Sequence, residues 1–179
     1  MYRTIVGKIM YLTHKLMTEG ISAAKDMSKS FMRPKKLHWK SIEQFVGYLK
    51  KEMNDIKLTY RKPLDLKFAA IADSIYVSNN LKRRSVSGAI YTLGRLIIGW
   101  TCKAQTHTTL LSTEAEYAAL ATAGQELMLV NNLMSNVEPL KQPGILLGDN
   151  KGAIALVKNR YNGARTKHID IRHHILRNL

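Results

Sequence analysis

The chain has 179 residues, of which 45% are hydrophobic, so it is long enough for one domain or two small ones and apolar enough to bury a core. This composition excludes wholesale disorder, and the longest apolar run, around residues 96–100, is far too short to cross a bilayer. A single cysteine, Cys102, excludes an internal disulfide framework and fits a reducing compartment.

The net charge of +15 is spread over the whole chain rather than gathered in one tail. Residues 1–63 carry 14 Lys and Arg against 5 Asp and Glu, and residues 64–179 carry 14 against 8. An excess of this size favours attraction to a polyanion, most simply nucleic acid, over a merely solubilising surface.

The first 63 residues are predicted to be helical. A first helix is indicated by apolar residues at helical spacing, which are Ile5, Ile9, Leu12 and Leu16. A second, weaker helix runs to about residue 32, because Pro34 disfavours helix in the residue before it. A third helix shows one apolar face, made of Trp39, Ile42, Phe45, Val46 and Leu49. Residues 53–65 then mix charge with Pro63 and lose periodicity, so we place a domain boundary after residue 63.

After this boundary the pattern changes to short apolar strands. KFAAIADSIYV, SGAIYTLG and RLIIGWTC, followed by TTLLS, suggest an antiparallel meander. A long helix is predicted for residues 113–134. It is followed by GILLGDN as a buried strand that ends at an acid, NKGAIALVKN as a short helix, and RTKHIDIRHHILRNL as a basic last helix. This order indicates the α/β class, with helices packed on a mixed sheet.

Two glutamates, Glu114 and Glu116, stand at the start of the long helix. Residues two apart point about 200° apart around a helix, so they cannot share a face. Glu116 falls on the face of Leu120, Ala123 and Leu127, which is the side expected to pack on the sheet. A carboxylate there needs a partner. An equally weighted alternative is a capping box, in which Thr113 and Glu116 satisfy backbone donors.

Other acids of the second domain also occupy unusual places for surface charges. Asp73 interrupts a strand, Asp149 ends one, and Asp170 lies in the last helix. Carboxylates that converge in a fold repel one another, and hard divalent cations relieve this repulsion. We therefore predict a shared cation site made of Asp73, Glu116, Asp149 and Asp170, in which two metal ions would serve phosphodiester cleavage.

Four stretches in this order, LKRRSVSGAIYTLG, LLSTEAEYAALATAGQE, GDNKGAIALVKN and ARTKHIDIRHHILRNL, resemble the ribonuclease H domain of copia-type LTR retrotransposon Pol polyproteins. YRTIVGKIMYL and HWKSIEQFVGYLKKE resemble the segment that connects reverse transcriptase to ribonuclease H. The resemblance covers roughly residues 2–178 and leaves out the polymerase core, so we expect a fragment or remnant of such a polyprotein.

The resemblance implies a ribonuclease H-like α/β fold, with a mixed five-stranded sheet and flanking helices, preceded by a small helical connection or thumb-like segment. It implies hydrolysis of RNA in RNA–DNA hybrids with two Mg²⁺ ions, or Mn²⁺ in their place. The family's catalytic and metal-binding acids fall on Asp73, Glu116, Asp149 and Asp170. The chain departs from many relatives at Ile75, where they have a second acid.

The remaining candidates concern nucleic acid. Arg83, Arg84, Arg165, Lys167 and Arg172 are predicted to contact phosphates, which positions nucleic acid without reading its sequence. His173 or His174 is a candidate for proton transfer beside Asp170. Ser85 and Ser87 are candidates for phosphate contact or, equally, for a turn.

Two expectations about context follow from the resemblance. The partners are an RNA–DNA hybrid and the remainder of a Pol polyprotein or reverse transcriptase, at an intracellular site, in a cytoplasmic virus-like particle or the nucleus. The alternative function is a catalytically inert, basic nucleic-acid-binding remnant or a domesticated interaction domain.

Overall fold

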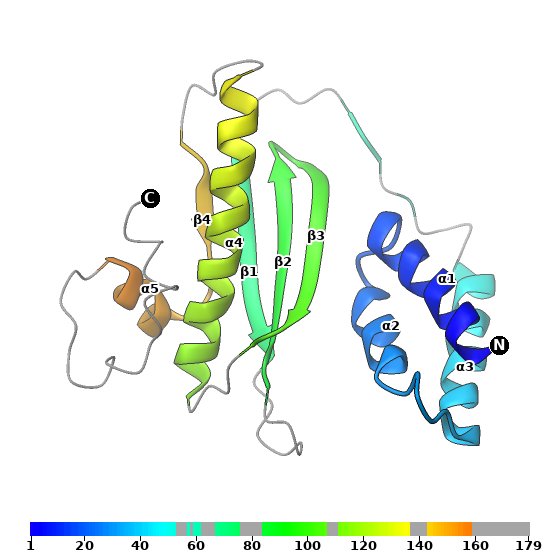
Figure 1. Ribbon diagram of the computed structural model, residues 1–179. Coiled ribbons are helices and arrows are strands. Elements are labelled where there is room, and N and C mark those ends of the chain that lie inside the picture. Colours follow the sequence, from blue (N-terminus) through cyan, green and yellow to red (C-terminus); the bar gives the residue numbers. More distant parts are fainter. Residues whose placement is uncertain are drawn as a thin grey trace. The chain divides into compact units, whose positions relative to one another are not determined.

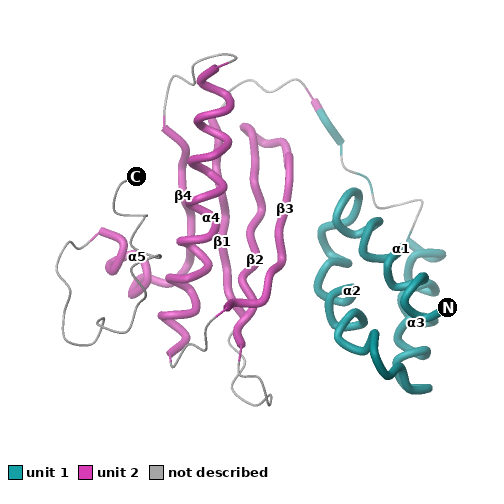
Figure 2. The backbone as a smooth tube through the Cα atoms, viewed as in Figure 1, with its two compact units in different colours: residues 1–60 teal, residues 61–179 magenta. Residues whose placement is uncertain are grey.

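The computed structural model describes residues 1–52, 57, 59–61, 67–75, 84–106, 111–136 and 143–158. The chain divides into two compact units, Met1–Tyr60 and Arg61–Leu179 (Figure 2). The sequence placed this division after residue 63. Among the described residues, no helix is both long enough and apolar enough to cross a membrane.

The first unit consists of three helices, as predicted: α1 (Tyr2–Lys15), α2 (Ile21–Ser28) and α3 (Lys36–Glu52). Its core is built from all three helices. The buried residues of this core are Tyr2, Val6, Ile9, Ala24, Met27, Ile42 and Phe45. The predicted apolar face of α1 was partly wrong, because Leu16 is 60% exposed while Val6 is fully buried. The partner helices, rather than the most apolar spacing, decide which side of α1 is covered.

The second unit is built on a sheet of four described strands: β1 (Phe68–Ile75), β2 (Val86–Leu93), β3 (Leu96–Ala104) and β4 (Ile145–Leu147). The strand order is β3-β2-β1-β4, with the first three strands antiparallel and β4 parallel to β1. Gly94, with a φ of 59°, allows the tight turn between β2 and β3. In the predicted TTLLS strand, Leu111 and Ser112 belong instead to the start of a helix, and residues 108–110 lie outside the described part.

Helix α4 (Ser112–Ser135) packs along β1 and β2, and α5 (Lys151–Lys158) packs against α4 (Figure 1). The core between sheet and helix uses alternate residues of β1, namely Phe68, Ala70 and Ala72, because successive side chains of a strand point to opposite faces. On α4 it uses Tyr117, Leu120, Ala123 and Leu127. The small alanines let the helix approach the sheet closely. The predicted α/β class, a mixed sheet with flanking helices after a helical segment, is confirmed.

Candidate functional site

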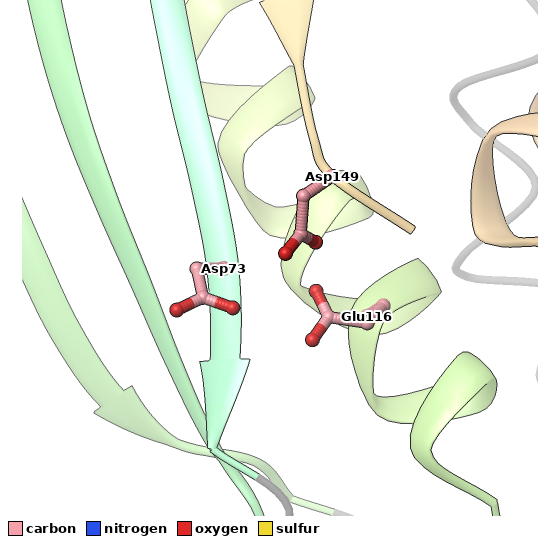
Figure 3. A group of neighbouring side chains, drawn as sticks. All are labelled: Asp73, Glu116 and Asp149. Atoms are coloured by element: carbon pink, nitrogen blue, oxygen red, sulfur yellow. The ribbon is translucent and has the colours of Figure 1, made fainter. Parts of the chain in front are cut away.

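Three of the predicted acids come together although they are far apart in the sequence. Asp73 lies near the end of β1, Glu116 in the first turns of α4, and Asp149 two residues beyond the end of β4. Each offers a carboxylate oxygen, and these oxygens all lie within 4.8 Å of one another. Figure 3 shows the three side chains pointing toward one another from β1, from α4 and from the segment after β4.

The parallel pairing of β1 with β4 brings the two aspartates to the same level of the sheet. Ile71 pairs with Leu147, and Asp73 and Asp149 each follow two residues later. Because parallel strands run in the same direction, residues that follow a pair by the same number of positions stay near each other. The strand register therefore explains why Asp73 and Asp149 lie near each other.

The residues on either side of Asp149 determine where β4 ends and the next helix begins. A Cβ on Gly148 would lie 2.9 Å from Leu120 Cδ2, so glycine at this position lets the chain approach α4 closely. Asn150 Oδ1 accepts a hydrogen bond of 2.9 Å from the Ala153 N–H, which caps α5. The GDN sequence thus ends a strand, presents an acid and starts a helix within three residues.

Glu116 is placed by its face on α4 and by a contact with β1. It shares that face with Leu120 and Leu127, which are buried, as predicted. The Ser74 hydroxyl donates a hydrogen bond of 2.9 Å to Glu116 Oε1, and the Ser74 N–H donates one of 2.7 Å to Asp73 Oδ1. Ser74 therefore contacts two of the three acids, a role that the sequence analysis missed.

The capping-box interpretation of Glu116 is wrong. The N-cap of α4 is Leu111, in an extended conformation, and it makes no side-chain cap hydrogen bond. Thr113 lies inside the first turn, so its hydroxyl is not at the position that a capping box requires. The Glu116 carboxylate accepts a hydrogen bond from β1 instead.

The environment of Glu116 raises the pKa of its carboxyl group. Burial is the largest cause, because desolvation disfavours the charged form. The hydrogen bonds from Ser74 lower this pKa, and the negative charges of Asp73 and Asp149 raise it further. A set of carboxylate oxygens is the donor set that hard divalent cations such as Mg²⁺ and Mn²⁺ prefer. The three residues therefore fit the predicted kind of cation.

A buried polar cluster at the start of α4 was not predicted. Gln105, which follows β3 and is 9% exposed, donates from Nε2 to Ser87 Oγ at 2.9 Å and to the Ala115 carbonyl at 2.8 Å. Its N–H donates to the Ser85 carbonyl at 2.8 Å. Both serines are buried, so their interpretation as phosphate contacts is wrong. The cluster ties the sheet to the residue that precedes Glu116.

The other predicted site residues lie mostly outside the described part of the chain. Those outside it are Asp170, Arg83, Arg165, Lys167, Arg172, His173 and His174. Arg84 is described and is exposed, two residues before the start of β2. The roles given to these residues stay predictions.

Comparisons with known proteins place the chain among transposon proteins. It is 29% identical over 178 residues to the retrovirus-related Pol polyprotein from transposon TNT 1-94 of Nicotiana tabacum. It is 31% identical over 179 residues to the corresponding polyprotein from transposon RE1 of Arabidopsis thaliana. Both alignments cover 99% of the chain. The homologues of the chain are retrovirus-related Pol polyproteins from plant copia-type transposons. The family predicted from the sequence is therefore confirmed.

The chain corresponds to a small part of each of these relatives. It spans 13% of the TNT 1-94 polyprotein and 12% of the RE1 polyprotein. No protein-family model matches it. Among solved structures, it is similar to the N-terminal ribonuclease H domain of a Mycobacterium tuberculosis protein, with 13% identity, a TM-score of 0.44, and coverage of 64% of this chain and 76% of that one. The sheet is mixed and flanked by helices, as predicted, and the described residues form four of the five strands that were expected.

Proposed function

We propose that the unit Arg61–Leu179 is a ribonuclease H-type nuclease that hydrolyses the RNA strand of RNA–DNA hybrids. The observation that carries this proposal is that the carboxylates of Asp73, Glu116 and Asp149 come together between a mixed sheet and the helix packed on it. The three acids come from β1, α4 and the segment after β4, and each occupies a place in the sequence that is unusual for a surface charge. The similarity of the chain to retrovirus-related Pol polyproteins supports the same conclusion.

In the proposed mechanism, Asp73, Glu116 and Asp149 would hold divalent cations, Mg²⁺ or Mn²⁺, with Asp170 as a fourth ligand. Two bound ions supply an activated water and stabilise the leaving oxygen in phosphodiester hydrolysis. The fold holds the three carboxylates close together before a cation binds. The pairing of β1 with β4 positions the two aspartates, and helix α4 places Glu116 beside them. His173 or His174 would assist proton transfer.

The basic surface would hold the nucleic acid. A net charge of +15 attracts phosphates without regard to sequence, and this attraction weakens with salt. Arg83, Arg84, Arg165, Lys167 and Arg172 are the proposed phosphate contacts. The 2′-hydroxyl would distinguish the RNA strand from DNA. The remainder of a Pol polyprotein is the proposed protein partner.

The test is Mg²⁺-dependent cleavage of an end-labelled RNA–DNA hybrid, with Asp149→Asn as the matched variant. We expect the parent to cleave the RNA strand and EDTA to stop it. Asp149→Asn should bind the hybrid as well as the parent or slightly better, because it loses one negative charge, yet cleave nothing. A parent that binds the hybrid with a steep salt dependence but never cleaves would establish the inert binding remnant instead.

A further inference from the structure

Ser74 lies between two acids of the proposed site and is bonded to both. Its hydroxyl donates to Glu116 Oε1 at 2.9 Å, across the interface between β1 and α4. Its backbone N–H donates to Asp73 Oδ1 at 2.7 Å. A substitution at residue 74 that removes the hydroxyl abolishes the first hydrogen bond and leaves the second, which comes from the backbone.

The position of Ser74 on β1 explains why its hydroxyl meets α4. Phe68, Ala70 and Ala72 are the buried residues of β1 that face α4, and Ser74 continues this alternation. At the same level α4 presents Glu116 in place of a further apolar residue. The pattern of the interface thus changes from apolar packing to one hydrogen bond at the point where the acids converge.

Glu116 needs such a donor. Its carboxylate is partly buried beside Asp73 and Asp149, and a buried charge without hydrogen bonds is costly. A hydrogen bond to a charged group is stronger than one between neutral groups. A hydroxyl fixed on a strand also restricts the rotation of a glutamate side chain, which otherwise has several rotamers.

We propose that Ser74 is a positioning residue, whose hydroxyl orients the Glu116 carboxylate for binding of a divalent cation together with Asp73 and Asp149. This inference rests on the proposed function, since it concerns the same acids. If the Ser74 hydroxyl only connected β1 to α4, its loss would lower the stability of the metal-free protein and leave the affinity for the cation unchanged. A positioning role instead predicts a loss of affinity for the cation.

The experiment measures Mn²⁺ binding to the full chain by isothermal titration calorimetry, and the melting temperature without metal. Three variants are compared with the parent: Ser74→Ala, Ser74→Val and Ser74→Thr. Valine and threonine have the same shape and both suit a strand, so this pair differs only in the hydroxyl. Thr122→Val is the control, because Thr122 donates to the Ala118 carbonyl at 3.0 Å within α4, away from the acids.

Loss of a group that orients a metal ligand costs about 10–100-fold in affinity. We therefore expect the Kd for Mn²⁺ to rise about tenfold in Ser74→Ala and Ser74→Val, and to stay near the parent value in Ser74→Thr and Thr122→Val. Equal affinity in the valine and threonine variants overturns the proposal, as does a parent that binds no Mn²⁺. A parent whose affinity for Mn²⁺ depends on the Ser74 hydroxyl but that does not cleave a hybrid leaves this inference standing and removes only the proposed function.

Discussion

The two units of the chain carry nearly the same net charge and arrange it differently. Met1–Tyr60 has 12 basic against 5 acidic side chains, a net charge of +7, and Arg61–Leu179 has 16 against 8, a net charge of +8. In the first unit, Asp26 pairs with Lys29 at 2.6 Å on an exposed helix surface. In the second, three acids converge within 4.8 Å.

This difference shows that net charge does not locate chemistry. An exposed ion pair such as Asp26–Lys29 contributes about 0–1 kcal/mol and is screened by salt. Clustered carboxylates oppose folding unless a cation or hydrogen bonds compensate them. We therefore expect the first unit to affect the binding of nucleic acid, and the acids of the second unit to affect cleavage.

The largest expected effect concerns the choice between the two glutamates of α4. Glu116→Gln keeps the shape of the side chain and an acceptor for Ser74, but it removes the charge. Because losing a group that merely orients a ligand costs about 10–100-fold, losing the ligand should slow cleavage by at least about a hundredfold. Glu114→Gln, on another side of the helix, should leave the rate unchanged. Single-turnover cleavage of a hybrid measures both, and a larger loss in Glu114→Gln would contradict our assignment.

A smaller effect is expected from the solvent side of α3, which carries Lys36, Lys40 and Lys50 beside Glu43, all exposed. Replacing the three lysines with Gln should weaken hybrid binding and make its log–log salt dependence shallower by up to about 0.9 for each lost phosphate contact. Cleavage at saturating enzyme should not change, because the acids are untouched. Fluorescence anisotropy at several salt concentrations measures the slope. A slope equal to that of the parent would show that the first unit does not contact the hybrid.

The same contrast between the units explains how much could be predicted from the sequence. Periodicity predicted the three helices of the first unit and the long helix of the second, because local apolar spacing determines these elements. Asp73, Glu116 and Asp149 were found because each interrupts or ends an apolar pattern in a basic chain. The relation of Glu116 to the packing face of α4 was also correct, since it follows from helix geometry alone.

The predictions that were wrong or missing concern features that depend on contacts between elements. Leu16 was assigned to the buried side of α1, but the neighbouring helices cover another side. Ser74 and Gln105 gave no recognisable pattern, because a single Ser or Gln acquires its role only when a distant element is placed beside it. Ser85 and Ser87 were candidates for phosphate contact or a turn, and their burial next to Gln105 could not be predicted for the same reason.

The smallest expected effect follows from the raised pKa of Glu116, whose ordinary value is 4.5. Burial is the main cause, and the charges of Asp73 and Asp149 add to it. Because the folded state holds this proton more tightly than the unfolded state, it binds more protons in the pH range just above 4.5. The contribution of Glu116 to stability is therefore fully present at low pH and is lost as the pH rises through the folded pKa.

Glu116→Gln removes this pH-dependent loss, so without divalent cations the variant should melt at a higher temperature than the parent at pH 7. The difference should shrink as the pH falls toward 4.5, because the parent then becomes protonated at Glu116.

Saturating Mg²⁺ should act in the opposite sense. It should raise the melting temperature of the parent by binding to the folded state, and leave the melting temperature of Glu116→Gln nearly unchanged. Scanning calorimetry with EDTA and with Mg²⁺ measures both, and Glu114→Gln is the control that should keep the response to Mg²⁺. A difference between Glu116→Gln and the parent that is the same at both pH values would contradict the electrostatic description of the three acids.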